Sequence, residues 1–495
     1  MTGVSNVLIT FTGELGLPPM KMFSSLCFLI ILSTSLAAQQ QQPGVLAFTH
    51  VTVIDMTGAQ PKKDMTVVIT GDRITAIKQT RHVRVPRGAR IINATGQFLI
   101  PGLWDMHVHF TETERTFPMF IANGVVGVRN TGGKAEDLFR WREEVTKGSL
   151  VGPRIVACGP IVDGPDIVAR GPAVGVGSPA EGREMVRKLK QQGADFIKVY
   201  DQLARDTYFA IIDEARKLNI PVVGHVPVSI TTIEASDAGQ KSIEHLGSIL
   251  EGSSTVEAEL RSWPEPQVKN GDYSVIPRNI AARGTRMLDT YDAARARNVF
   301  VHLVKNQTWQ VPTLVTKRSL ALVDEIVRVD DERLKYVPAS VQRRWSPQEN
   351  FLLRYRTLEY ITYNKRLFQK ELELVRAMHD AGVPFMTGTD LSIPYVFAGF
   401  SLHDEMALLV QAGFTPMEVL QAATRNPAIF LGESNSFGTV ERGKLASLVL
   451  LEANPLENIH NTQRISGVIL KGRYFSKQEL QQMLQEAERI ARTEK

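Results

Sequence analysis

The chain has 495 residues, enough for two or three domains, and 43% hydrophobic with 22% charged residues is ordinary for a protein with a large core. The formal net charge of +5 comes from interspersed charges without a long basic run, so no nucleic-acid partner is expected. The two cysteines exclude a disulfide framework and a Cys-x-x-Cys metal site.

A secretory signal peptide is predicted at about residues 20–38. Residues 23–38 form an apolar stretch that follows Lys21 and precedes four glutamines. Ser35-Leu36-Ala37 places small residues where a signal peptidase reads the chain. We therefore expect a secreted or periplasmic protein without stable membrane insertion after signal removal. Because the apolar stretch is short for a membrane span, an uncleaved anchor is the less favoured alternative.

Both ends of the remaining chain carry short β patterns punctuated by glycine. One set spans residues 46–92, and the second spans residues 438–475. The pattern predicts one small β-sandwich domain formed by residues 45–97 and 433–476. Residues 1–38 are assigned to an upstream extension and the signal peptide, and residues 477–495 are predicted to form a surface helix.

Between these ends, at residues 98–432, strand patterns alternate with helical ones, which predicts an α/β fold of the TIM (β/α)8 barrel type. The eight candidate strands are residues 98–103, 124–130, 154–159, 195–200, 221–226, 242–247, 310–315 and 384–390. Two long connections, residues 250–304 and 316–376, are largely helical by pattern. Each follows a strand and would lie over the barrel mouth, either as part of a substrate pocket or as structural decoration.

Polar residues occur at the ends of several of these strands. His107 and His109 point to the same face of an extended segment and can bind one metal ion, although a chance structural pair is the alternative. A lysine within an apolar strand, such as Lys198, is costly unless it is paired or loses its charge. Carboxylation by CO2 would let it bridge two cations, whereas the alternative is a side chain that snorkels to the mouth. Later strands end in His225, His245 and Asp390.

The whole set of motifs resembles the amidohydrolase superfamily, in the branch of imidazolonepropionases and Xaa-Pro dipeptidases. The motifs that carry the resemblance are PGLWDMHVH, FIKVY, GHV, EHL and GTD, each at its strand end. The flanks are similar too, at residues 48–108, 401–432 and 438–456. Two departures, Asn130 in the place of an acidic residue and Ser447 in the place of Asp, leave the substrate open.

The resemblance implies a role for each residue of the set. His107, His109 and Asp390 would bind the more buried of two divalent metal ions, with zinc as the usual metal. His225 and His245 would bind the more exposed ion. Carboxylated Lys198 would bridge both, together with a hydroxide. Asp390 would also be catalytic, first as the general base and then as the general acid.

The resulting functional hypothesis is an exported binuclear metal-dependent hydrolase of a C–N bond in a small-molecule substrate, such as a dipeptide or a cyclic amide. A non-catalytic barrel that serves as a binding or structural module is the first alternative, and a mononuclear deaminase is the second. Tyr200 and Arg129 are candidates for contact with substrate, and Asp105 and Glu244 for support of the histidines. A homo-oligomer is compatible with the sequence.

Overall fold

The computed structural model describes residues 44–167, 171–269, 271–326, 330–346, 348–391 and 393–494. The predicted signal peptide at residues 20–38 lies outside the described residues. Pro43–Lys495 is one compact unit, and the domain boundaries predicted within it stay predictions.

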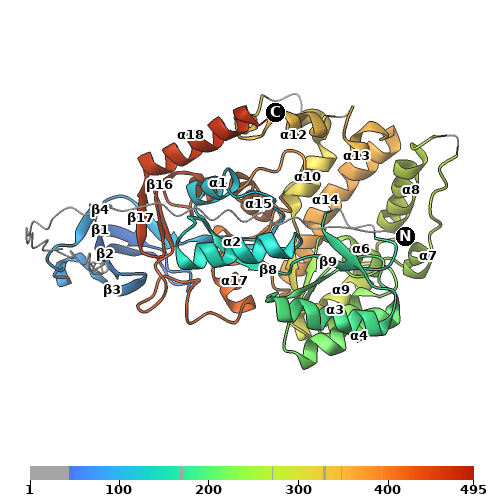
Figure 1. Cartoon of the computed structure of the whole chain (residues 1–495), viewed down its shortest axis with the longest axis horizontal. Coiled ribbons are helices and arrows are strands. Elements are labelled where there is room, and N and C mark those ends of the chain that lie inside the picture. Colours follow the sequence, from blue (N-terminus) through green and yellow to red (C-terminus); the bar gives the residue numbers. More distant parts are fainter. Residues whose placement is uncertain are drawn as a thin grey trace, which may run out of the picture. The chain divides into compact units, whose positions relative to one another are not determined.

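The two ends of this unit share one eight-stranded β-sheet, which we call the end sheet (Figure 1). Its strand order is β17-β16-β15-β5-β1-β2-β3, with β4 paired to β1. The strands are β1 (Val45–Val53), β2 (Lys62–Thr70), β3 (Arg73–Gln79), β4 (Arg90–Asn93), β5 (Phe98–Pro101), β15 (Leu448–Leu451), β16 (Ile465–Leu470) and β17 (Arg473–Ser476). The joining of the two chain ends agrees with the sequence prediction, while its layering as a sandwich stays a prediction.

The predicted first barrel strand, residues 98–103, is wrong, because the structure divides this apolar run between two sheets. Phe98–Pro101 is β5 and pairs antiparallel with β15 in the end sheet. The histidines belong instead to the following strand, β6 (Leu103–Val108), which pairs parallel with β7 (Val125–Asn130). Gly102 separates the two strands, and a Cβ atom there would overlap the Val126 side chain. The run reads as one strand because both halves are buried.

The middle of the chain forms two parallel sheets covered by helices, a TIM-barrel-type α/β arrangement. One has the order β6-β7-β8, and the other has the order β10-β9-β11-β12-β13-β14. The further strands are β8 (Arg154–Ala157), β9 (Ile161–Asp163), β10 (Ala173–Gly175), β11 (Ile197–Val199), β12 (Val222–Gly224), β13 (Ser242–Glu244) and β14 (Trp309–Val311). The strands predicted within residues 124–315 all occur, and β9 and β10 are additional.

The segment predicted as the eighth strand, residues 384–390, lies between β14 and β6. Met386 N donates to Gln310 O (2.9 Å), and Met106 N donates to Thr387 O (2.9 Å). The segment makes an isolated parallel bridge, Gln310↔Phe385, and is not a continuous strand. Closure of all eight strands into one barrel stays a prediction.

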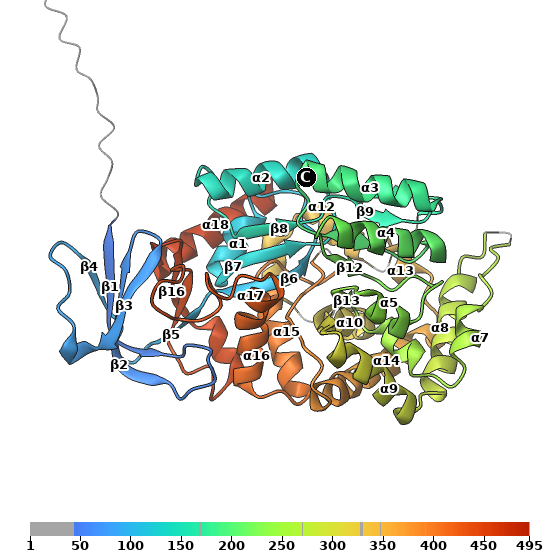
Figure 2. The ribbon, with the colours of Figure 1, turned by 90° about the horizontal axis from the view of Figure 1, so that it is seen from below.

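Helices follow the strands in the order expected of an α/β protein, and α2, α3 and α4 lie along one side of the parallel strands (Figure 2). The first group is α1 (Thr116–Ala122), α2 (Ala135–Lys147), α3 (Pro179–Gln192), α4 (Arg205–Lys217) and α5 (Thr232–Ala238). The two long connections are largely helical, as predicted. Their helices are α6 (Gly247–Gly252), α7 (Glu257–Arg261), α8 (Val275–Asp289), α9 (Ala293–Lys305), α10 (Leu314–Ala321), α11 (Val323–Ile326), η2 (Glu332–Tyr336), α12 (Ala339–Trp345), α13 (Phe351–Arg354) and α14 (Leu358–Asp380).

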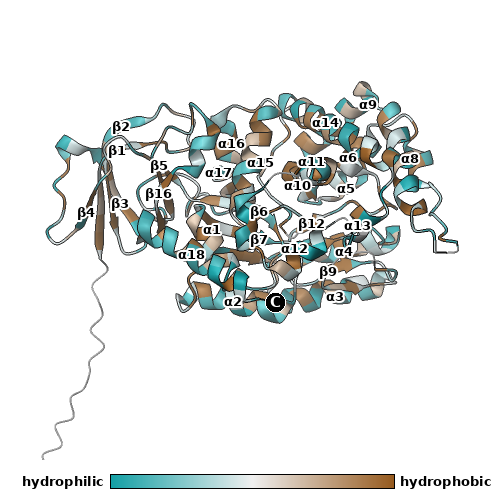
Figure 3. Cartoon of the chain, turned by 90° about the horizontal axis from the view of Figure 1, so that it is seen from above, coloured by the Kyte–Doolittle hydropathy of each residue, from teal (hydrophilic) through white to brown (hydrophobic). Residues whose placement is uncertain are grey.

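The remaining elements are outside the parallel sheets. η1 (Thr80–His82) lies between β3 and β4, and η3 (Ile459–Gln463) lies between β15 and β16. α15 (Phe400–Gln411), α16 (Pro416–Ala422) and α17 (Arg425–Phe430) precede β15, and α18 (Lys477–Thr493) follows β17. The predicted C-terminal helix is confirmed as α18, which Ser476 and Glu479 begin with a reciprocal capping box. The helix packs on α1, η2, β16 and β17. Figure 3 shows teal, hydrophilic residues along α18.

Across the residues that the structure describes, none of the helices has the length and apolar character needed to cross a membrane.

Candidate metal centre and active site

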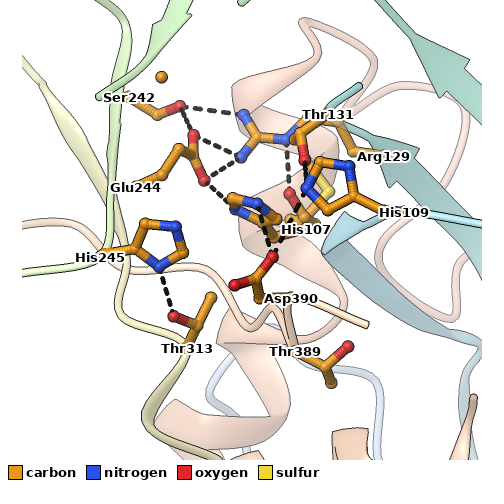
Figure 4. A network of polar contacts seen from close by, with 12 residues as sticks. His107, His109, Arg129, Thr131, Ser242, Glu244, His245, Thr313, Thr389 and Asp390 are labelled. Atoms are coloured by element: carbon orange, nitrogen blue, oxygen red, sulfur yellow. Dashed lines mark hydrogen bonds and ion pairs between the residues drawn. The ribbon is translucent and has the colours of Figure 1, made fainter. Parts of the chain in front are cut away.

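Histidine side chains at the ends of β6, β12 and β13 meet at one end of the parallel sheets, and Figure 4 shows three of them, His107, His109 and His245, beside Asp390. His107 and His109 lie at the end of β6, and their Nε2 atoms are 3.4 Å and 3.5 Å from Asp390 Oδ1. His245 follows β13, and the centre of its ring is 5.0 Å from that of His107 and also 5.0 Å from that of His225. The structure therefore brings these five predicted ligands together, with the N/O donor set that suits zinc.

Each of the four imidazoles has a hydrogen-bond partner for Nδ1. These partners are Glu244 Oε2 for His107 (2.8 Å), Gly132 O for His109 (3.0 Å), Asp201 Oδ1 for His225 (2.9 Å) and Thr313 Oγ1 for His245 (2.7 Å). Carboxylate and carbonyl oxygens only accept, so Nδ1 carries the proton in the first three histidines. In the neutral form of each ring, Nε2 then keeps its lone pair, which is the state in which a histidine binds a metal ion.

Burial keeps two of these imidazoles uncharged. Desolvation, with the nearby Lys198 next in importance, holds the pKa of His107 well below its ordinary value. Desolvation is also the main cause that holds the pKa of His245 well below its ordinary value. Both side chains are therefore neutral at pH 7, as a metal ligand must be.

Lys198 is buried in β11 beside the histidines. Its Nζ atom has no hydrogen-bond partner among the described residues, and the side chain is 1% exposed. Burial lowers the pKa of its amine, which favours the neutral form. A buried amine without a partner is costly, and conversion to a carboxylate between two cations would remove that cost. The predicted carboxylation therefore fits the surroundings of this residue.

Three residues of the site have a left-handed backbone conformation, which is rare for residues other than glycine. They are His245 (φ 64°), Thr313 (φ 50°) and Asp390 (φ 57°). Such strain persists only where the surrounding structure fixes it, and it clusters at functional sites. At Asp390 it is fixed by a hydrogen bond from the backbone N to His107 O (2.8 Å).

Arg129 supports the residues around the histidines. The contact with substrate that the sequence suggested for it does not fit its position. It is fully buried and does not line the cavity that holds the histidines. Its Nη2 donates to both carboxylate oxygens of Glu244 (2.7 and 2.8 Å), and Nε donates to Met106 O (2.6 Å). Although burial opposes it, the charge of Arg129 keeps the pKa of Glu244 below its ordinary value. Arg129 thus keeps Glu244 ionised, and Glu244 in turn orients His107.

Asp105 supports the segment that carries Asp390. It accepts hydrogen bonds from Thr389 N (3.0 Å) and Thr389 Oγ1 (2.7 Å), and burial raises its pKa to about 7. Asp105 and Glu244 are therefore both placed beside the histidines, where the sequence suggested supporting residues.

The predicted ligands open into a cavity of about 490 Å³. Lys198 and Tyr200 also line it, and the Tyr200 ring stacks on that of His225 with 4.0 Å between ring centres. Part of its wall comes from Val337, which follows η2, from α12 and from residues after Asp390. The second long connection therefore contributes to the pocket, whereas no described residue of the first, residues 250–304, lines it.

Several supporting residues were not identified from sequence. Asp201 follows the strand that carries Lys198, and an acidic residue directly after a strand end was an available signal. Thr313 and Gly132 gave none, because a threonine and a glycine carbonyl are found in every protein. They reach the histidines only because the fold brings their strands together.

Comparison with known proteins identifies a family and a relative for this chain. Residues 98–474 match the amidohydrolase family. The imidazolonepropionase of Thermoplasma acidophilum is 35% identical over 89 residues, which cover 17% of this chain and 20% of that enzyme. The matched region is thus only about a fifth of that relative's length.

Solved structures show the same fold at low sequence identity. A Xaa-Pro dipeptidase with bound methionine in its active site is 21% identical, with a TM-score of 0.64 over 88% of this chain and 100% of the other. A bottromycin amidohydrolase is 22% identical, with a TM-score of 0.69 over 91% of each chain. Because the family match spans well over half of the sequence, the chain belongs to the amidohydrolase family.

Proposed function

We propose that this protein is a binuclear metal-dependent hydrolase that cleaves a C–N bond in a small amide, such as a dipeptide or a cyclic amide. The observation that carries the proposal is the arrangement of four strand-end histidines, each held through Nδ1 while their rings gather beside Asp390. An arrangement of this kind is what a metal centre requires, and a chance cluster of histidines would not have it.

Six side chains would hold the two metal ions. His107, His109 and Asp390 have the ligand atoms that lie within 4.8 Å of one another, and they would hold the inner ion. The other ligands would be His225, His245 and carboxylated Lys198. When bound, two zinc ions supply Lewis acidity, which lowers the pKa of water toward neutrality and polarises the scissile carbonyl.

The chain's own residues would carry the proton and the charge. The neutral Lys198 amine would form a bond to the carbon of CO2 and release one proton, which leaves a carbamate with one negative charge. The Asp390 carboxylate would accept a proton from the attacking water and deliver it to the leaving nitrogen. Tyr200, on the cavity wall beside His225, would contact the substrate.

The size of the cavity supports a small substrate. A volume of about 490 Å³ lies within the range of small-molecule sites. The names of the relatives, a Xaa-Pro dipeptidase, an imidazolonepropionase and a bottromycin amidohydrolase, support an amide or cyclic amide as the substrate.

The test combines metal analysis with hydrolysis. Zinc-loaded protein should contain about two metal ions per chain and should hydrolyse members of a dipeptide and lactam panel. Asp390→Asn should lower kcat roughly 10²- to 10⁴-fold, because a positioned proton-transfer group contributes that much. Lys198→Ala should lose metal and activity together. Asp380→Asn, at an exposed position on α14, is the control and should leave both unchanged.

Two results would contradict the proposal. One is a protein that hydrolyses amides equally well after removal of divalent metal. The other is full activity and full metal content in Lys198→Ala.

We also propose that the protein is exported. The apolar segment at residues 23–38 followed by a polar run supports this. Fusion of residues 1–44 to a reporter should direct it out of the cytoplasm, and replacement of two apolar residues within the segment by Lys should abolish export.

A further inference from the structure

The outer part of the cavity wall contains two arginines in different electrostatic situations. Arg115 is neutralised, because its Nη2 lies 3.0 Å from Glu112 Oε1. Its Nη1 also donates to Tyr336 O (3.1 Å), which fixes the guanidinium against η2. Arg115 and Glu112 together therefore present no net charge to a ligand.

Arg344, in the last turn of α12, lines the same cavity. Its side chain makes no hydrogen bond and no ion pair with any residue that the structure describes. It is consequently the one arginine of this wall, within the described part of the chain, whose charge is not compensated by a neighbour. The neighbouring Arg343 is also exposed but does not line the cavity.

The backbone that carries Arg344 is held in place by an apolar cluster. The next residue, Trp345, is buried, with its ring centre 5.9 Å from that of Phe397 and 5.5 Å from that of Tyr395. Val337 belongs to the same cluster, and Val337, Trp345 and Phe397 also line the cavity. Among the described residues, this part of the cavity wall thus combines apolar surface with one uncompensated positive charge, that of Arg344.

We propose that the substrate is a small amide with a carboxylate group, which pairs with Arg344 while an apolar part of the molecule packs on Trp345 and Phe397. This inference rests on the proposed hydrolase function and narrows its substrate class. A guanidinium matches a carboxylate through two parallel N–H···O bonds, which gives direction as well as attraction. The amide would then lie at the inner, histidine-lined end, and the carboxylate would lie toward the mouth.

The experiment uses pairs of substrates that differ only in the remote group. Each pair is an N-acyl amino acid or dipeptide with a free carboxylate and the same compound with a carboxamide, so the scissile bond does not change. The zinc-loaded wild-type protein should have the higher kcat/KM for the acid. Arg344→Gln should lower kcat/KM for the acid roughly five- to tenfold, mainly through KM, and should leave the carboxamide unchanged.

Two further variants separate charge recognition from a structural role. Arg343→Gln removes an equal charge one residue away from the cavity and should behave as wild type toward both compounds. Arg344→Lys should recover part of the preference for the acid, because it restores the charge without the planar geometry. Metal content should be the same in all variants.

The possible failures are distinguishable. Hydrolysis of both members of each pair at equal kcat/KM by the wild type would overturn this inference and leave the hydrolase proposal standing. An equal loss on both compounds in Arg344→Gln would overturn it too, by showing that Arg344 only maintains the wall. Absence of all amide hydrolysis would overturn the proposed function. In that case, calorimetry can still test the inference by measuring the binding of N-acetyl amino acids and of their carboxamides. Equal affinity for the acid and the carboxamide, or equal affinity of the wild type and Arg344→Gln for the acid, would reject it.

Discussion

The histidines of this protein depend on residues that would not themselves bind metal. Asp201 accepts the Nδ1–H of His225, and Thr313 and Glu244 contact Nδ1 of two others. Partners of this kind fix the orientation of the ring and raise its basicity. Metal affinity at the proposed centre would therefore depend on supporting residues from several different strands.

Asp201→Ala should weaken zinc binding at one of the two sites by about 10- to 100-fold, because His225 would lose its orienting carboxylate. Competition with a chromogenic chelator measures the affinity. Asp237→Ala is a matched control, because Asp237 makes a similar contact (2.8 Å) with Nδ1 of His302 outside the cavity. Equal zinc affinity in the Asp201 variant and the wild type would show that His225 needs no such support.

Residues of the site could be predicted from the sequence where a reactive side chain also had the spacing expected of a strand. His107 and His109 share a face because they are two residues apart on a strand, and Lys198 stood out as a charge in an apolar run. Arg129 was misplaced, because the same periodicity does not say whether a side chain faces the mouth or the interior. Arg344 gave no signal, since an exposed arginine in a helix is ordinary.

At the scale of elements, the start of α10 positions part of the site. Thr313, which contacts His245, immediately precedes this helix. Glu405 of α15 accepts a hydrogen bond from Val315 N (2.7 Å), while its Oε1 has no partner among the described residues. Burial raises the pKa of Glu405 to about 8. A side chain from a distant helix thus caps α10, and it does so mainly as the neutral acid at pH 7.

Glu405→Gln should change how stability depends on pH. The pKa of Glu405 is about 8 in the folded state, which is above its ordinary value of 4.5. The protonated side chain therefore stabilises the fold below pH 4.5, and this contribution is lost as the pH rises toward 8. The Gln variant keeps the acceptor oxygen and does not titrate. The metal-free variant should therefore gain, relative to the wild type, about 1.4 kcal/mol in free energy of unfolding per pH unit within that window.

Urea unfolding of the metal-free proteins at pH 5 and pH 8 measures this gain. Glu373→Gln, at an exposed position on α14, should show no comparable gain. A constant difference between the Glu405 variant and the wild type at both pH values would mean that Glu405 does not titrate in this range.

Element types were more predictable than element boundaries. Alternation of apolar strands and amphipathic helices identified most parallel strands and α18. The division of residues 98–108 into β5 and β6 was not visible, because burial on both faces removes the polar residues that would mark a change of sheet. The Pro101-Gly102 pair was the available signal for a break between two strands. Its structural reason is visible only in the fold, where the Val126 side chain leaves no room for a Cβ atom at Gly102.

At the scale of the whole described unit, α18 connects the end sheet with the walls of the cavity. It packs on β16 and β17, and also on α1 and η2, both of which adjoin cavity-lining residues. Leu480 is buried in this contact, with Ala487 and Ala491 further along the same side. The C-terminal helix therefore stabilises elements from distant parts of the chain.

Leu480→Ala should lower the free energy of unfolding by about 2–5 kcal/mol, because it leaves a cavity where a buried leucine was. Leu358→Ala removes the same atoms at a position that is 76% exposed, and it should change stability by less than about 0.5 kcal/mol. Thermal or urea unfolding measures both. Equal stability of the two variants would mean that α18 is not part of the cooperative core.

One part of the cavity wall, residues 337–345, carries none of the proposed metal ligands. Mutations accumulating in this stretch can therefore alter which molecules are admitted without disturbing bond cleavage. Diversification of such proteins toward new substrates would begin here. For the same reason, a protein engineer who seeks a new specificity would randomise this stretch and leave the strand ends untouched.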